Sequence, residues 1–118
     1  FRDDIVKYET EAVEDAKILV VAYGSPARSA LRAVRQAREK GIKAGFFRPI
    51  TLWPFPDKEV GALAAKAHTV LVPELNCGQM VLEVERAVAG RARVLGQSLV
   101  NGELFKPSAI LAKIEEVA

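Results

Sequence analysis

The sequence predicts an α/β protein, a three-layer α/β/α sandwich with helices on both sides of a parallel sheet. Three observations lead to this class. Residues 18–22 form a continuous apolar run, as expected for a strand covered on both faces. Strand-like segments then alternate with amphipathic segments of helical length along the chain. Glycines stand where two of the helical segments should end. The crossovers should be right-handed.

Length and composition bound the class of protein. We expect one domain, 1–118, large enough for a core without disulfides or metal. The net charge of +2 is too small to argue for nucleic acid. Cys77 is the only cysteine, which excludes an internal disulfide and fits a reducing cytoplasm. No apolar run approaches the ~20 residues of a membrane helix, and no signal peptide precedes the first strand. The chain begins at Phe1 without Met, so we expect a piece of a longer polypeptide.

The first strand–helix unit is the clearest part of the chain. Gly24 suits the sharp turn after strand 17–23, and Pro26 suits the first position of helix 26–40. One face of this helix is predicted to be buried: Ala27, Ala30, Leu31, Val34 and Ala37. Gly41 ends it. Before this unit, alternation over residues 5–10 indicates a short edge strand.

Four arginines form a basic stripe beside the apolar face of helix 26–40: Arg28, Arg32, Arg35 and Arg38. We call them the arginine stripe. A solvated helix face is its simpler interpretation. The alternative is a docking surface for an acidic partner chain or for a ligand anion.

Three further strands are predicted at 43–48, 69–72 and 92–95. A helix should follow each of these strands. Asp57 is a candidate N-cap of the first helix, the second closes at Gly90, and the last has Pro107 or Ser108 at its start. Their predicted core faces are Val60, Leu63, Ala64 and Ala67; Met80, Val81, Val84 and Val88; and Ile110, Leu111, Ile114 and Val117.

Three prolines between residues 49 and 56 exclude a helix or a central strand there. We expect an extended connection that holds Leu52, Trp53 and Phe55 against the body. Packing at a subunit or domain contact is the favoured role of this proline segment, and a peptide-binding site is the alternative.

The turn at Gly24 and Ser25 is one candidate site. It places a helix N-terminus at the carboxyl end of a parallel strand, where open sheets usually bind ligands. Ser25 and the free amides of the helix start could bind an anion there, whereas a plain helix cap is the structural alternative. Neither the three-glycine dinucleotide fingerprint nor the phosphate-binding loop is present.

A second candidate site follows strand 69–72. Glu74, Asn76 and Gln79 should emerge at the same sheet edge and could hydrogen-bond a ligand or a neighbouring subunit. Turn formation by Asn76 and Gly78 is the structural alternative.

No pattern in the sequence indicates catalysis by this domain. His68 precedes strand 69–72 and Cys77 follows it, so they should lie at opposite ends of the sheet, too far apart for a nucleophile–base pair. One histidine and one cysteine cannot form a structural zinc site. No pair of carboxylates has a spacing that recommends acid–base chemistry.

Three segments together resemble one known family: Leu19-Val20-Val21-Ala22-Tyr23-Gly24-Ser25; Gly41-Ile42-Lys43 through Arg48-Pro49-Ile50-Thr51-Leu52-Trp53-Pro54-Phe55-Pro56; and Val72-Pro73-Glu74-Leu75-Asn76 with Gly78-Gln79. Over roughly residues 8–115 the chain resembles the C-terminal domain of the alpha subunit of 2-oxoacid:ferredoxin oxidoreductases. That domain is similar to the transketolase C-terminal domain. Within the family the chain looks closest to the 2-oxoglutarate type, followed by the branched-chain or general 2-oxoacid enzymes.

The resemblance implies a mostly parallel sheet with one antiparallel edge strand, for which residues 5–10 are the candidate. It also implies an enzyme that decarboxylates a 2-oxoacid on thiamine diphosphate, reduces ferredoxin through an iron–sulfur cluster and forms an acyl-CoA. In the family, thiamine diphosphate and magnesium lie between the preceding domain of this subunit and the beta subunit. No catalytic residue is therefore transferred to this chain, which would act as an accessory assembly domain without nucleic-acid or membrane partners.

Two functional hypotheses follow. An assembly domain should carry an apolar patch around Leu52, Trp53 and Phe55. A free-standing flavodoxin-like module that binds a small molecule or anion should instead carry a pocket at five residues: Gly24, Ser25, Arg28, Glu74 and Asn76.

Overall fold

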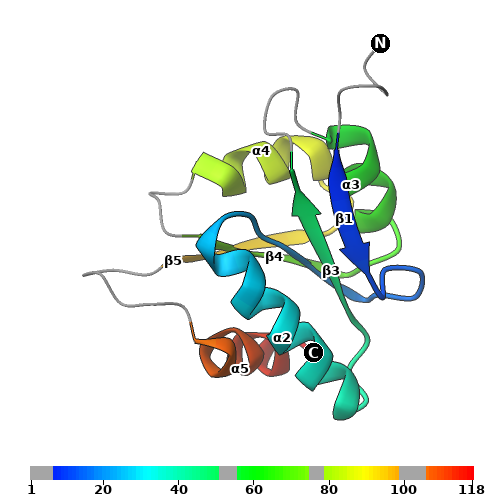
Figure 1. Cartoon of the computed structure of the whole chain (residues 1–118). Helices are drawn as coiled ribbons and strands as arrows, with labels where there is room; N and C mark the ends of the chain where they lie inside the picture. The colour runs from blue at the N-terminus through cyan, green and yellow to red at the C-terminus, as the bar shows by residue number, and fades with distance from the viewer. Residues whose placement is uncertain (1–6, 51–55, 75–78, 99–105) are drawn as a thin grey trace.

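The computed structural model describes residues 7–50, 56–74, 79–98 and 106–118, and these form a five-stranded sheet flanked by helices (Figure 1). The strand order is β1-β3-β2-β4-β5. The elements along the chain are β1 (Tyr8–Glu11), β2 (Ile18–Val21), α2 (Ser25–Glu39), β3 (Ala44–Pro49), α3 (Asp57–Ala64), β4 (Thr69–Glu74), α4 (Gln79–Val88), β5 (Arg93–Ser98) and α5 (Pro107–Val117).

The sheet is parallel except at one edge. β2 pairs in parallel with β3 and β4, and β4 pairs in parallel with β5. β1 runs antiparallel to β3, with Tyr8 opposite Pro49 and Glu11 opposite Phe46. The predicted antiparallel edge strand is therefore confirmed, although the described strand begins at Tyr8 and extends to Glu11.

Helices cover both faces of the sheet, which confirms the three-layer architecture. α2 packs against α5 on one face and α3 packs against α4 on the other (Figure 1). The central strand β2 supplies both cores because successive side chains point to opposite faces. Ile18 and Val20 lie in the core under α2 and α5, whereas Leu19 and Val21 lie in the core under α3 and α4.

α2 is flanked by two glycines whose backbone φ angles are positive. Gly24, with φ of 69°, precedes Ser25, and Gly41, with φ of 82°, follows the helix, as its place just beyond the last turn predicts. The predicted apolar face is confirmed: four of its alanine and valine side chains are buried and Leu31 packs against them as a half-buried residue. The helix is thus fixed on β2 and β3 through small side chains.

Several predicted boundaries are wrong. β4 continues beyond Val72 through Pro73 and Glu74. β2 pairs with β4 only as far as Leu71, so beyond that residue β4 has one neighbouring strand and tolerates a proline as an edge strand does. β5 likewise extends past Leu95 to Ser98.

Asp57 is not the N-cap of α3. Pro56 holds that position, and Asp57 is the first helical residue, with its carboxylate accepting a hydrogen bond from the backbone N–H of Lys58 at 2.9 Å. An acidic side chain in the first turn still favours the positive end of the helix.

The proline segment lies largely outside the described residues, with Leu52, Trp53 and Phe55 among those not described. Its first proline, Pro49, closes β3, and Pro56 is buried before α3. In the described part of the chain, no helix has the length and apolar character needed to cross a bilayer.

Candidate functional site

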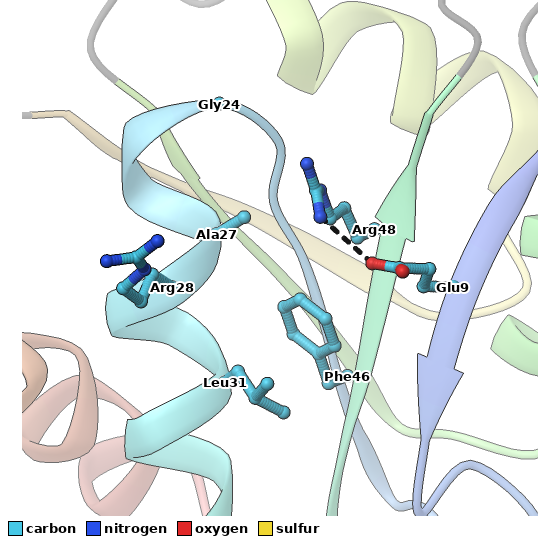
Figure 2. Close-up of a pocket in the computed structure, with 7 residues that line it drawn as sticks. All are labelled: Glu9, Gly24, Ala27, Arg28, Leu31, Phe46 and Arg48. Carbon is cyan, nitrogen blue, oxygen red and sulfur yellow. Dashed lines mark hydrogen bonds and ion pairs between the residues drawn. The ribbon is translucent and has the colours of Figure 1, made fainter.

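A pocket of about 230 Å³ lies beside the start of α2, between this helix and the strands β3 and β1 (Figure 2). Its residues come from segments far apart in the chain and are Glu9, Gly24, Ala27, Arg28, Leu31, Phe46 and Arg48. It lies at the carboxyl ends of β2 and β3, the side of a parallel sheet where ligands usually bind.

The floor of the pocket is apolar. Ala27 and Leu31 point from α2 toward the aromatic ring of Phe46 on β3, as Figure 2 shows. Phe46 is 4% exposed and belongs to the core under α2. The sequence brings Phe46 here because alternate residues of β3 face α2, whereas Phe47 faces the opposite core.

The rim of the pocket is charged. Arg48 donates from Nη1 to Glu9 Oε1 at 2.9 Å, an ion pair that joins β3 to β1 and stays substantially exposed. Arg28 is exposed, and its side chain makes no hydrogen bond or ion pair among the residues that the structure describes. Gly24 has open space around the position of a side chain, and the first turn of α2 contains no acidic residue. The positive end of the helix is therefore not balanced by an acid of its own.

The structure brings two of the predicted site residues together and separates a third. Gly24 and Arg28 line the same pocket. Glu74 does not line it. Its carboxylate lies in β4, 4% exposed, and accepts hydrogen bonds from the backbone N–H groups of Met80 at 3.0 Å and Val81 at 3.2 Å. Glu74 therefore stabilises the start of α4, which occupies both of its oxygens.

Other predicted site residues are placed only partly or not at all. Ser25 is the first residue of α2 and Gln79 the first residue of α4. Trp53, Phe55 and Asn76 lie outside the described residues, as does Cys77. His68 is exposed just before β4, with Nδ1 2.8 Å from Thr69 Oγ1.

Glu9, Phe46 and Arg48 are pocket residues that the sequence did not indicate. The signal that could have found them is the pairing of the edge strand with β3, which sets Glu9 opposite Arg48. Opposite charges directly across an antiparallel pair are a recognised stabilising combination.

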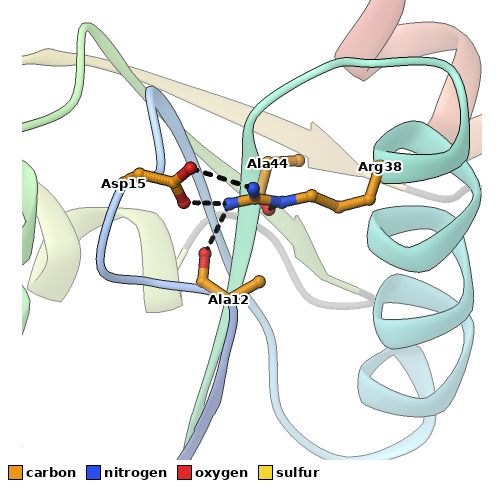
Figure 3. Close-up of polar contacts among 4 residues, drawn as sticks. All are labelled: Ala12, Asp15, Arg38 and Ala44. Atoms are coloured by element: carbon orange, nitrogen blue, oxygen red, sulfur yellow. Dashed lines mark hydrogen bonds and ion pairs between the residues drawn. The ribbon is translucent and has the colours of Figure 1, made fainter.

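Two residues of the arginine stripe, Arg35 and Arg38, bind other parts of the protein through their side chains. Arg38 donates to the carbonyl oxygens of Ala44 and Ala12, each at 2.8 Å, and to Asp15, whose Oδ1 is 2.6 Å from Nη2 (Figure 3). Arg35 makes a two-bonded pair with Glu11, with both distances 2.8 Å.

These hydrogen bonds shift the pKa values of three of the side chains that they join. The hydrogen bond from Arg38 holds the pKa of Asp15 below its usual value, and the hydrogen bond from Arg35 does the same for the pKa of Glu11. Glu11 in turn raises the pKa of Arg35. Two arginines of the stripe thus fasten α2 to β1 and to the turn that follows β1.

Among the described residues, no group of three His, Cys, Asp or Glu side chains is placed to hold a metal ion. The pocket offers arginine donors and an apolar floor, a combination suited to an anionic group with an apolar neighbour.

Comparison with known families decides the assignment. A family model described as "Pyruvate:ferredoxin oxidoreductase core domain II" matches residues 16–110. The chain belongs to this family. The matched part runs from the end of the β1–β2 turn into α5, so core domain II includes most of both cores and every pocket residue except Glu9.

Relatives of this core domain II are subunits of 2-oxoacid oxidoreductases. The chain is 45% identical over 113 residues to 2-oxoglutarate synthase subunit KorA of Methanothermobacter thermautotrophicus, covering 96% of this chain and 30% of the relative. It is 42% identical to ketoisovalerate oxidoreductase subunit VorB of Methanothermobacter marburgensis, covering 96% of this chain and 32% of that protein. The chain therefore spans about a third of the length of these relatives.

Solved structures share the fold. A chain of 2-oxoglutarate:ferredoxin oxidoreductase from Magnetococcus marinus, with 2-oxoglutarate, coenzyme A and succinyl-CoA bound, aligns with a TM-score of 0.81 at 24% identity, over 98% of this chain and 20% of that chain. A split-gene transketolase aligns with a TM-score of 0.75 at 18% identity, over 92% and 40%. These alignments confirm the transketolase C-terminal-like fold.

Proposed function

We propose that core domain II of this protein is an accessory assembly domain in the alpha subunit of a 2-oxoacid:ferredoxin oxidoreductase. The observation that carries this proposal is the 45% identity to a KorA subunit over 96% of the chain. The parent enzyme would oxidatively decarboxylate a 2-oxoacid to an acyl-CoA and transfer the electrons to ferredoxin. Its partners would be the preceding domain of the same subunit and a beta subunit.

The cofactors of such an enzyme would be thiamine diphosphate with magnesium, an iron–sulfur cluster and coenzyme A. Those residues of this domain that the structure describes do not fit a metal site, because no three ligating side chains converge among them. As the family resemblance implies, we propose no chemical step for this domain. Its contribution would be to hold the neighbouring parts of the enzyme in the geometry that the active site requires.

The substrate we propose is 2-oxoglutarate. Four KorA relatives are 41–45% identical to the chain, two VorB relatives are 40–42% identical, and a pyruvate synthase subunit PorA is 27% identical. The small margin over the VorB proteins makes 2-oxoisovalerate the competing substrate.

Replacement of residues 16–110 in the full-length subunit by a flexible linker tests the role of the domain. We expect loss of the native complex in analytical ultracentrifugation and loss of 2-oxoacid-dependent, coenzyme-A-dependent ferredoxin reduction. An intact oligomer with full activity would contradict the proposal.

The substrate is tested by measuring ferredoxin reduction by the unaltered enzyme with 2-oxoglutarate, 2-oxoisovalerate and pyruvate. The highest kcat/KM should be obtained with 2-oxoglutarate.

The second candidate function is binding of a small anion, which the pocket between Gly24 and Arg48 favours. In that case inorganic phosphate or citrate should bind the full-length protein in calorimetry, and Arg48→Gln should abolish binding. Absence of measurable binding to the unaltered protein at millimolar anion concentration would rule this function out.

A further inference from the structure

A shallow groove runs along α2 on the side facing β1. Three hollows of about 230, 370 and 470 Å³ lie next to one another along it, and neighbouring hollows share lining residues. The first two share Glu9, Leu31 and Phe46, and the first and third share Arg28 and Leu31. In Figure 1 this strip of β3 and β1 beside α2 has no helix in front of it.

The groove has an excess of unpaired positive charge. Its lining includes four arginines and three glutamates, of which Glu9 and Glu11 are already bound by Arg48 and Arg35. This leaves Arg28 and Arg32 against Glu39. Both arginines are exposed and, within the described parts of the chain, neither makes an ion pair or side-chain hydrogen bond.

Arg28 and Arg32 lie one helical turn apart on α2 and therefore present their guanidinium groups on the same face. Like charges at this spacing slightly destabilise a helix. The charges of Arg35 and Arg38 are compensated, because these side chains bind acids of β1 and of the turn after it. Within the described structure, the charges of Arg28 and Arg32 have no such compensation.

We propose that this groove docks an acidic polypeptide segment of a partner subunit, with Arg28 and Arg32 as the charged contacts and Leu31 and Phe46 as the apolar floor. This inference rests on the proposed function in a multisubunit enzyme. An open groove along a whole helix fits an extended or helical segment better than a small molecule, for which pockets are usually enclosed. Complementary charge selects an acidic segment and speeds its association.

The test uses the full-length subunit and its purified partner subunit. Arg28→Glu combined with Arg32→Glu should weaken their association roughly tenfold at low salt, because two attractive contacts become repulsive. The difference should shrink at about 0.5 M salt, where exposed charges are screened. Lys58→Glu combined with Lys66→Glu is the matched control, since it makes the same change in net charge on the opposite layer of the fold and should leave association unchanged.

A photo-crosslinking residue in place of Gln36, which lines the groove, identifies the occupant within the assembled enzyme. We expect a peptide of the partner subunit rich in Asp and Glu, and charge reversal of its acids should restore association with the Arg28/Arg32 double variant. Crosslinks to the same polypeptide would overturn the assignment to a partner subunit. Unchanged association of the double variant would overturn the docking surface, as would tight phosphate binding that only Arg28 and Arg32 support.

This outcome is separable from that of the proposed function. If removal of residues 16–110 dissociates the enzyme but reversal of the two arginines does not, the assembly role stands and only the docking groove is wrong.

Discussion

Glu74 illustrates how a polar residue near a strand end can be structural. Its carboxylate is buried and accepts two backbone N–H groups at the start of α4. Glu74→Ala would leave the buried N–H of Met80 and the part-buried N–H of Val81 without this acceptor, so we expect a loss of about 2 kcal/mol in the free energy of unfolding. Glu74→Gln keeps one acceptor oxygen and should lose about half as much. Urea unfolding measures both, and Glu85→Ala on the exposed face of α4 is the control.

A loss for Glu74→Ala no larger than that for Glu85→Ala would show that the carboxylate does not stabilise α4. The sequence placed Glu74 correctly at the carboxyl edge of the sheet but could not assign its partners. An acid five residues before the first residue of a helix can cap that helix or face a ligand, and only the path of the chain between the two decides.

Asp15 gives a prediction at acidic pH. Its usual pKa is 3.8, and the hydrogen bond from Arg38 lowers the pKa in the folded protein. The ionised carboxylate thus stabilises the fold at every pH above the unfolded value, and this stabilisation is lost as pH falls through the folded value. The difference in unfolding free energy between the unaltered protein and Asp15→Asn should be constant above about pH 5. It should decrease as the pH falls below about 4.

The Arg38→Gln background isolates the cause. There, the change in unfolding free energy caused by Asp15→Asn should vary far less with pH, because the charged donor has been removed. A pH dependence that persists undiminished in this background would assign the shift to another group.

At the level of elements, the edge strand β1 has one hydrogen-bonding side turned toward β3. The N–H of Ile50 donates to the carbonyl of Lys7 at 2.9 Å, which makes this a hydrogen-bonded pair. In an antiparallel ladder such pairs alternate, so Glu9 is hydrogen-bonded to Arg48 through the backbone while Thr10 directs its N–H away from β3. The same alternation turns the nitrogen of Pro49 toward β2, which has already ended at Val21.

This alternation predicts different costs for proline at adjacent positions. Relative to alanine at the same position, Glu9→Pro should lose at least about 1 kcal/mol more unfolding free energy than Thr10→Pro, since only the first removes a ladder hydrogen bond. Chemical denaturation of the four variants gives the comparison. A larger cost at Thr10 would indicate that β1 pairs one residue out of this register, and equal costs would show that the ladder hydrogen bond of Glu9 does not stabilise the fold.

The sequence predicted the kind and order of the elements better than their ends. Amphipathic spacing was sufficient for α2, because its apolar face and both flanking glycines are local signals. The end of β4 depends on which strands lie beside it: Pro73 fits a strand only where a single neighbour remains. Only part of the pocket was predicted for the same reason, since Gly24 and Arg28 are local to α2 whereas Glu9, Phe46 and Arg48 arrive through strand pairing.

For the whole molecule, stability should decrease from the centre of the sheet toward β1. β2 is paired on both sides and all four of its residues are buried, whereas β1 is mostly exposed and has one neighbour. Amides of β2 should therefore exchange with solvent only when the domain unfolds globally, and amides of β1 through local opening. Hydrogen–deuterium exchange should find the highest protection in β2 and the paired part of β4.

Val20→Ala tests this gradient. Val20 is fully buried in the core under α2 and α5, so its truncation should lower global stability by about 2 kcal/mol. The free energy of exchange should fall by that amount in β2 and change little in β1, because local opening of β1 does not expose the core. An equal fall in both strands would mean that β1 opens only with the rest of the sheet. In that case the groove beside β1, which carries the proposed docking surface, would have a rigid wall before any partner binds.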